Sequence, residues 1–193
     1  MEATLMPLVQ ATLRTPRDAA EQIMGFQLSR DTLWTALALC AALHALVLQL
    51  LLSISEPAVP LPRYMYQPLT LFVLIAGVLV IYVHALHWAA RAIGGDGQLW
   101  DMLSVMVWLQ ILRAVAQVVL LVVGLALPLL GALLTLVVGI WGLWILFHFI
   151  AAAGRLPTAG HGIVVVVMAA VGLLLGLGLI LSLIGLSAQG VTT

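Results

Sequence analysis

The chain has 193 residues, of which 64% are hydrophobic and 7% are charged, and its formal net charge at neutral pH is zero. A soluble domain carries about 45–50% apolar and about 25% charged residues, so this composition excludes an ordinary water-soluble fold. The chain contains no lysine and lacks the clustered basic surface that nucleic acid requires, so we expect no nucleic-acid partner.

Residues 1–31 form a polar lead, which we expect to be a cytoplasmic amphipathic segment. Thr15, Pro16 and Asp18 indicate a helix start, with an N-cap residue, a proline in the first turn and a carboxylate at the positive end of the helix dipole. Apolar residues between Ala19 and Leu28 then cover one arc of this helix. The helix either lies in the headgroup layer or docks on the inner ends of the transmembrane helices.

Five apolar stretches follow, and each is long enough to cross a bilayer, which takes about 20 helical residues. They cover residues 32–54, 68–90, 103–127, 129–153 and 162–186. Prolines or glycines in the gaps predict turns, including a proline-rich loop at 56–62 and a tight hairpin at Pro128. The sequence therefore predicts an all-α integral membrane protein: a bundle of five transmembrane helices over 32–186, preceded by an amphipathic cytoplasmic helix and followed by a short polar tail at 187–193.

The arginines predict the orientation of this bundle. Five fall on the side of the N-terminus, and only Arg63 falls in a loop on the other side; the five are Arg14, Arg17, Arg30, Arg91 and Arg155. Because positive residues are retained in the cytoplasm, we expect a cytoplasmic N-terminus and a C-terminus on the outer side. The first apolar run starts too late for a cleaved signal peptide, so we expect that span to be retained.

Two segments carry a resemblance to a known family. One is the lead Pro16-Arg17-Asp18-Ala19-Ala20-Glu21-Gln22-Ile23-Met24, and the other is the loop Gly94-Gly95-Asp96-Gly97-Gln98-Leu99-Trp100. With five spans, they resemble the Yip family of membrane proteins, named for interaction with Ypt/Rab GTPases. The resemblance is to the bacterial type and implies a location in the bacterial inner membrane. The lead is short and the third span lacks a proline expected from the family, so Rab binding and functional residues are not carried over.

One arginine lies inside a span. Arg113 stands near the middle of the third span, with Gln110 and Gln117 three residues before and four residues after it. A charge within the bilayer costs about 2.5–3.5 kcal/mol or more to insert, which makes it a candidate functional residue. We expect the three side chains to form a polar stripe that faces the bundle interior. Arg113 either hydrogen-bonds carbonyls and reaches towards headgroups, or binds an anionic lipid or a partner's carboxylate.

Histidines are the other candidates for chemistry within the membrane. The second span carries His84, His87 and Arg91 on one face near its cytoplasmic end, while His148 and His44 lie in the fourth and first spans. Facing histidines could hold a haem iron or a metal ion. No CxxCH, HExxH or carboxylate–histidine pattern accompanies them. We therefore expect polar packing between helices, with no cofactor and no metal.

Small residues recur at helical spacing in two spans. Gly131, Thr135 and Gly139 repeat every four positions in the fourth span, and Gly172 and Gly176 do so in the fifth. Such positions let helix backbones approach closely. We expect them to pack within the chain, while a homo-oligomer or a larger complex stays an alternative.

Two functions remain compatible with the sequence. No serine–histidine–acid set can be assembled and no acidic residue lies inside a predicted span, so we expect neither an enzyme nor a classical ion-coupled transporter. The first interpretation is a non-catalytic protein of the Yip type that binds partners or organises lipid. The second is a small lipid or solute permeation protein that uses the polar cluster around Arg113. Its expected partners are the lipid bilayer, an anionic lipid, and a membrane protein or second copy.

Overall fold

The computed structural model describes residues 2–54 and 62–190, and every regular element in this part of the chain is a helix. The elements are α1 (Glu2–Arg14), α2 (Pro16–Gly25), α3 (Arg30–Ile54), a short 3-10 helix η1 (Arg63–Tyr66), α4 (Pro68–Ala92), α5 (Leu99–Ala126), α6 (Pro128–Ala153) and α7 (Ala159–Gly190). The all-α prediction is confirmed.

Five of these helices, α3 to α7, are long and apolar enough to cross a membrane. The five predicted transmembrane helices are therefore confirmed, and the break at Pro128 separates α5 from α6 as expected. The largest differences from the predicted ends are four residues each, because α5 begins at Leu99 and α7 continues to Gly190; the other ends differ by at most three residues. Most of the proline-rich loop predicted at 56–62, and the last three residues of the predicted tail, lie outside the described residues.

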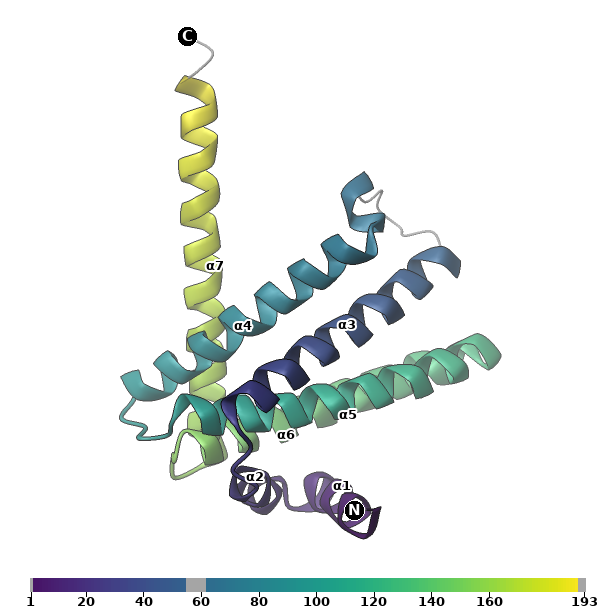
Figure 1. Cartoon of the computed structure of the whole chain (residues 1–193), viewed down its shortest axis with the longest axis vertical. Helices are drawn as coiled ribbons and strands as arrows, with labels where there is room; N and C mark the ends of the chain where they lie inside the picture. The colour runs from purple at the N-terminus through teal and green to yellow at the C-terminus, as the bar shows by residue number, and fades with distance from the viewer. Residues whose placement is uncertain (1, 55–61, 191–193) are drawn as a thin grey trace.

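The long helices converge at one side of the molecule and diverge from there, as Figure 1 shows. At this side α3, α5 and α7 begin, α4 and α6 end, and α2 lies across the helix ends. We call this side the polar end, meaning α2, the first turns of α3, α5 and α7, and the loops at 93–98 and 154–158. The parts of the five helices away from it, residues 46–54, 68–78, 111–144 and 170–190, are called the far half.

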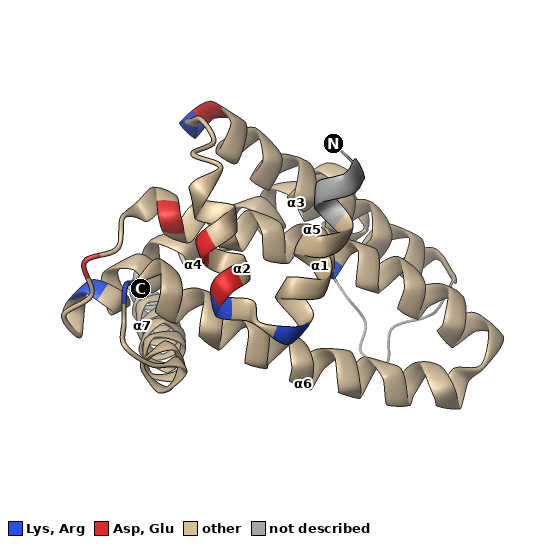
Figure 2. Cartoon of the chain, turned by 90° about the horizontal axis from the view of Figure 1, so that it is seen from below, with Lys and Arg blue, Asp and Glu red and all other residues tan. Residues whose placement is uncertain are grey.

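Charged residues gather at the polar end. Among the charged side chains that the structure describes, all except Arg113 lie there or at its junctions with α1 and α4: Arg14, Arg17, Asp18, Glu21, Arg30, Asp31, Arg91, Asp96, Asp101 and Arg155. Figure 2 shows them around α2 and the nearby helix ends. The distribution matches a membrane protein whose far half lies in hydrocarbon, where a charge is costly.

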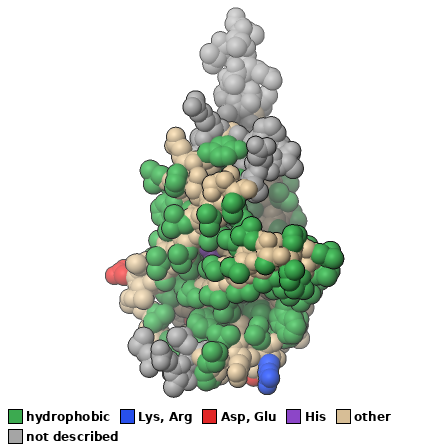
Figure 3. Space-filling view, turned by 90° about the vertical axis from the view of Figure 1, so that its right-hand side faces the viewer, with side chains coloured by type: hydrophobic (Ala, Val, Ile, Leu, Met, Phe, Trp, Pro, Cys, Tyr) green, Lys and Arg blue, Asp and Glu red, His purple; other side chains and the backbone are tan. Residues whose placement is uncertain are grey.

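The buried side chains also lie next to the polar end. Each transmembrane helix contributes to this core, for example through Leu37, Val83, Met106, Phe149 and Val165. In the far half, by contrast, only Leu71 and Gly131 are buried among the described side chains. Figure 3 shows hydrophobic side chains spread over the outer face of the molecule, which is the surface expected of helices in contact with lipid.

Glycines allow the helices to meet at the polar end. A methyl group on Gly97 would collide with the carbonyl oxygen of Ala153, and one on Gly95 would lie 2.7 Å from the carbonyl oxygen of Gly154. Gly94 adopts a φ of 91°, which favours glycine. The loop predicted as a turn is thus a turn that packs its backbone directly against the end of α6.

Of the five small residues predicted to pack between helices of the chain, Gly131 does so and Gly139, Gly172 and Gly176 do not, while the exposed Thr135 bonds to the Gly131 carbonyl of its own helix. Gly131 packs against Gly124 across the α5–α6 hairpin, where a methyl group would lie 2.5 Å from the Gly124 Cα. Gly139, Gly172 and Gly176 have no described atom in the space that a Cβ would take. All three glycines are exposed, and α6 and α7 diverge in the far half (Figure 1).

Helix α2 docks on the ends of the transmembrane helices. Its N-cap is Thr15, as predicted, but the Thr15 hydroxyl donates back to the carbonyl oxygen of Ala11 at 3.4 Å and does not cap α2. Ala19, Ala20 and Ile23 are buried, and α2 contacts α5 and α6. Of the two placements predicted for this helix, the structure therefore has the docked one.

Candidate binding site

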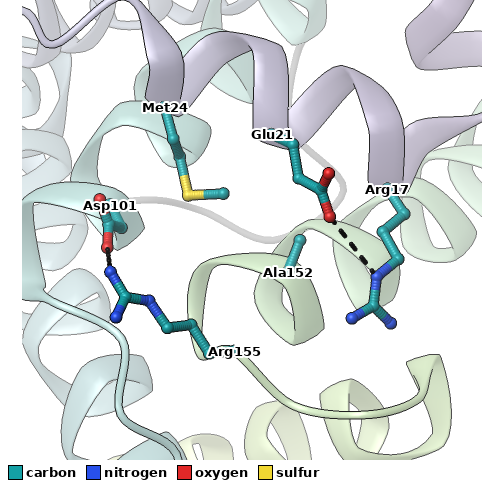
Figure 4. A pocket seen from close by; sticks show the side chains of 6 residues that line it. All are labelled: Arg17, Glu21, Met24, Asp101, Ala152 and Arg155. Carbon is teal, nitrogen blue, oxygen red and sulfur yellow. Dashed lines mark ion pairs between the residues drawn. The ribbon is translucent and has the colours of Figure 1, made fainter.

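An open pocket of about 330 Å³ lies between α2 and the ends of the transmembrane helices. Six residues line it: Arg17, Glu21, Met24, Asp101, Ala152 and Arg155. They come from α2, the first turn of α5, the last turn of α6 and the loop after it, so the pocket exists only when these segments are assembled. Figure 4 shows an ion pair on either side of it.

One wall carries Asp101 and Arg155. The Nη2 atom of Arg155 lies 3.7 Å from the Oδ2 atom of Asp101. The same carboxylate oxygen accepts a hydrogen bond from the backbone N–H of Gln98 at 3.2 Å, across the start of α5. Asp101 is therefore anchored to its helix terminus, where a negative charge is favourable, whereas the Arg155 side chain is 61% exposed.

The opposite wall carries Glu21 and Arg17. The Nε atom of Arg17 lies 3.9 Å from Oε1 of Glu21, one helical turn further along α2. The other two guanidinium nitrogens of Arg17 donate to the carbonyl oxygens of Pro157 at 2.8 Å and Leu156 at 3.1 Å. Arg17 thus ties α2 to the loop between α6 and α7, while the carboxylate of Glu21 extends towards solvent.

Arg155 occupies an unusual backbone conformation. Its φ is 54°, in the left-handed region that favours glycine, while Gly154 before it has a φ of −78°. Gly154 is crowded, because an added Cβ would lie 3.1 Å from the carbonyl oxygen of Ile150 and 3.3 Å from the Ala90 side chain. Gly154 therefore lies at the close contact between α4 and α6, and the strained left-handed position beside the pocket is occupied by Arg155.

Aromatic contacts support the segments around the pocket. The Arg30 guanidinium lies 4.3 Å from the ring centroid of Trp100, which joins the first turns of α3 and α5. The indole N–H of Trp108 donates to the hydroxyl of Thr12 at 3.0 Å, which joins α5 to α1. These tryptophans therefore make specific contacts between helices.

The predicted polar stripe on α5 is divided between two environments. Gln110 is buried, with 5% of its surface exposed, and Gln117 is partly buried. Arg113 is exposed on the outside of α5 and makes no ion pair within the described part of the chain. The prediction that all three face the bundle interior is therefore wrong at Arg113.

The predicted histidines bond mainly within their own helices. The Nδ1 atoms of His44, His84 and His148 lie 2.7–2.8 Å from the carbonyl oxygen four residues earlier in each case. His84 also stacks on Trp34, with ring centroids 6.1 Å apart, which is a contact between α4 and α3. Within the ranges described, no three His, Cys, Asp or Glu side chains are grouped to hold a metal ion.

Three buried polar atoms in α3 and α5 have no hydrogen-bond partner among the described residues: His44 Nε2, Gln49 Oε1 and Gln117 Oε1. The contact of Arg30 with Trp100 sets the level of the two helices. A helix rises about 1.5 Å per residue. Along α3, His44 therefore lies about 21 Å and Gln49 about 29 Å from Arg30. Along α5, Gln110 lies about 15 Å and Gln117 about 26 Å from Trp100. We use the name polar seam for these four buried or partly buried polar residues of α3 and α5: His44, Gln110, Gln117 and Gln49. Gln49 was absent from the predicted set.

The comparison with protein families matches the Yip1 domain over residues 11–181, from α1 to α7. The chain belongs to the Yip1 domain family. The match confirms the resemblance read from the lead and the loop, and it includes every residue that lines the pocket. No curated protein and no solved structure matches this Yip1 domain protein. It is an integral, multi-pass membrane protein whose five apolar helices contact the lipid bilayer.

The residues of the pocket were not predicted as a site. Arg17 and Arg155 were used to predict the orientation, and Arg17 and Glu21 belong to the lead that resembles the Yip family. A signal was present, since Arg17 and Glu21 lie one turn apart in the lead helix, Asp101 comes just before the predicted third span and Arg155 just after the predicted fourth span. The sequence of this Yip1 domain protein does not reveal that these four side chains line the same pocket.

Proposed function

We propose that this Yip1 domain protein acts without catalysis, by binding a lipid or a membrane-protein partner at its polar end. The observation that supports this most is the pocket, in which charged side chains from α2, α5 and the α6–α7 loop surround one open space. A bound partner could contact three separate segments at once and so sense whether α2 is docked. The far half presents an apolar surface to lipid and few polar groups that a polar partner could bind.

The composition of the pocket supports a binding role over a catalytic one. Its lining residues include no serine, cysteine or histidine, so it has no nucleophile paired with a base. Its two carboxylates each lie beside an arginine. Such a site is suited to recognising a charged or polar group by ion pairing and hydrogen bonding.

The orientation proposed for the protein places the pocket in the cytoplasm of a bacterial cell, beneath the inner membrane. The N-terminal segment 1–31 would lie there, the domain 32–186 would span the membrane, and the tail 187–193 would lie outside. Arginines retained on the cytoplasmic side support this orientation. The partner is a lipid, a membrane protein or a second copy of the chain, and Arg113 on the outside of α5 is placed to meet an anionic lipid group.

Site-specific photocrosslinking in native membranes tests the proposal. A crosslinker at the exposed Gln22 of α2 should capture a partner, and an equivalent one at the exposed Leu136 in the far half of α6 should yield only membrane lipid. Pro157→Gly keeps the carbonyl group that Arg17 bonds. This variant next to the pocket serves as a control and should leave capture by the crosslinker at Gln22 unchanged. Equal capture from the two positions would refute binding at the polar end.

A second candidate function is permeation along the polar seam. The buried and unpartnered atoms of His44, Gln49 and Gln117 support it, because polar groups without partners inside a membrane are costly and mark pathways for polar species. The seam includes His44, Gln110 and Gln117 of the predicted set. His84, His87 and Arg91 lie nearer the polar end of α4, and His148 lies in a similar position on α6.

Reconstitution into liposomes separates the two candidates. Lipid scrambling or solute flux that is lost in a Gln117→Leu variant would support permeation, while a Gln10→Leu variant, altered on the exposed surface of α1, controls for a general change in polarity. Silent liposomes together with crosslinks at the polar end would support binding.

A further inference from the structure

The pocket presents both signs of charge on each of two facing walls. Asp101 and Arg155 lie on one side, and Glu21 and Arg17 lie on the other, so the four formal charges cancel (Figure 4). A simple anion would be attracted by two guanidinium groups and repelled by two carboxylates, and a simple cation would meet the reverse. A ligand that carries both charges, a short distance apart, can satisfy both walls.

The ion pairs are long and open. At 3.7 and 3.9 Å they exceed the 2.7–2.9 Å of a charge-assisted hydrogen bond. Arg155 makes no hydrogen bond through Nε or Nη1 within the described residues, and Glu21 makes none through Oε2. Exposed pairs of this kind contribute little to stability. A ligand can therefore replace them at small cost.

One charge of each sign is held in place, and one is free to reorient. Arg17 is held by the carbonyl groups of Leu156 and Pro157, and Asp101 is held by the N–H of Gln98. Arg155 and Glu21, with side chains 61% and 65% exposed, are the free ones. They stand on opposite walls, so an anionic group at Arg155 and a cationic group at Glu21 would bridge the pocket.

The pocket lies at the level of lipid headgroups. Asp101 is the third residue of α5 and Arg155 follows the last residue of α6 by two, so both stand where transmembrane helices end. The polar headgroup layer borders the hydrocarbon core at this depth. Met24 extends between the two ion pairs in Figure 4, and with Ala152 it gives the pocket an apolar surface for the carbon atoms of a ligand.

From these features we infer that the pocket binds a zwitterion in which a phosphate and a primary ammonium are joined by a short carbon chain, the chemistry of phosphoethanolamine. The guanidinium of Arg155 donates to the phosphate through its two free nitrogens, a geometry for which arginine is well suited. The carboxylate of Glu21 accepts from the ammonium. This inference rests on the proposed binding function and names the ligand class of the same pocket.

The ligand source is either the headgroup of a phospholipid or a soluble phosphoethanolamine. Binding to the purified full chain in detergent distinguishes them. The protein is titrated with short-chain phosphatidylethanolamine, phosphatidylcholine and phosphatidylglycerol in turn, and with O-phosphoethanolamine, and bound ligand is measured by native mass spectrometry. Phosphatidylcholine has no ammonium N–H, and phosphatidylglycerol has no ammonium at all.

We expect phosphatidylethanolamine to bind about tenfold more tightly than the other two lipids, a difference of about 1.4 kcal/mol. Glu21→Gln should abolish this preference, because Glu21 contacts the ammonium, and Arg155→Asn should weaken binding of all three lipids about equally, because each carries the phosphate. Asparagine tolerates the left-handed backbone at position 155, so Arg155→Asn is expected to fold. Arg14→Gln, at an exposed arginine outside the pocket, should bind as the original chain does.

The outcomes separate this inference from the proposed function. Competition by O-phosphoethanolamine would show that the headgroup alone is recognised, and binding of the soluble compound without the lipid would assign the site to a free metabolite. Equal binding of phosphatidylglycerol and phosphatidylethanolamine, unchanged in Glu21→Gln, would overturn the inference. If none of these ligands binds while Gln22 still crosslinks a partner, the inference fails and binding at the polar end stands.

Discussion

The polar end and the far half of the same five helices are held together by different forces. At the polar end backbones touch at Gly95, Gly97 and Gly154, ion pairs and hydrogen bonds join separate segments, and the core side chains are buried. In the far half Gly139 and Gly172 face open space, and large apolar side chains are exposed.

The difference shows where the specificity of this fold lies. Lipid chains are as apolar as leucine, so burying a leucine against another helix gains little over leaving it in lipid. Close backbone contact and satisfied polar groups are what distinguish one helix arrangement from another in a membrane. Such contacts are found mainly at the polar end, so we expect the polar end to determine how the five helices are arranged.

The largest effect is expected from Gly97→Ala. The added methyl would collide with the carbonyl oxygen of Ala153, which is backbone and cannot move aside cheaply. Overpacking of this kind costs about 1–3 kcal/mol or more, and we expect about 3 kcal/mol here. Tryptophan fluorescence should report a melting temperature lower by about 6–12 °C.

The matched control for this variant is Gly139→Ala in the far half. A methyl at this position meets no described atom, and alanine favours helix over glycine by up to about 1 kcal/mol. We expect unchanged or slightly higher stability. Equal loss in both variants would break the contrast between the two regions.

A smaller effect is expected from Arg17→Ala, which removes both hydrogen bonds between α2 and the α6–α7 loop. The side chain is 42% exposed, so we discount its charge and expect about 1–2 kcal/mol. The loss should appear as local opening. Hydrogen exchange of the α2 amides should therefore accelerate about tenfold while the far half is unchanged.

The control for undocking is Arg14→Ala, because Arg14 is exposed and forms no hydrogen bond or ion pair with a described residue. Its α2 amides should exchange at the original rate. If the two variants behave alike, the loss of positive charge is responsible and the specific contacts of Arg17 are not.

Thr12→Val tests the attachment of α1. Thr12 is fully buried and its hydroxyl accepts the indole N–H of Trp108. Valine keeps the shape but leaves that N–H without its partner, which should cost about 1 kcal/mol. The change is measured as a shift in the denaturation midpoint. Thr135→Val should have no effect, since the Thr135 hydroxyl bonds only to the Gly131 carbonyl within exposed α6.

The smallest effect is expected from Asp101→Asn. The pair with Arg155 is long and partly exposed, and such pairs contribute about 0–1 kcal/mol. Asparagine can still accept the N–H of Gln98. We expect a loss below about 0.5 kcal/mol in thermal unfolding, comparable to the effect of high salt on the original chain. A loss above about 2 kcal/mol would mean that the polar end depends on this charge.

Much of the architecture can be predicted from the sequence, because long apolar runs and the turns between them are local signals. The break at Pro128 and the start of α2 after Thr15 follow from residues adjacent in the chain. The start of α5 was placed four residues late, because the polar residues Gln98 and Asp101 mark a helix start within what reads as a loop.

The site was less legible, for a physical reason. Core-facing and lipid-facing positions are both apolar in a membrane helix, so periodicity does not reveal which face is inward. Arg113 therefore could not be assigned a direction from its neighbours. Arg17 meets Pro157 across 140 residues, and Trp108 meets Thr12 across 96, and no local pattern encodes either contact.

The contact between Arg17 and the loop after α6 also has a consequence for biosynthesis. During translation residue 17 leaves the ribosome long before Pro157 does. The Arg17 guanidinium therefore lacks the carbonyl acceptors of the α6–α7 loop until α3 to α6 have been synthesised. Contacts this distant in sequence form late. The Arg17 contacts of α2 can therefore form only after the fourth transmembrane helix, α6, and the loop that follows it have been synthesised.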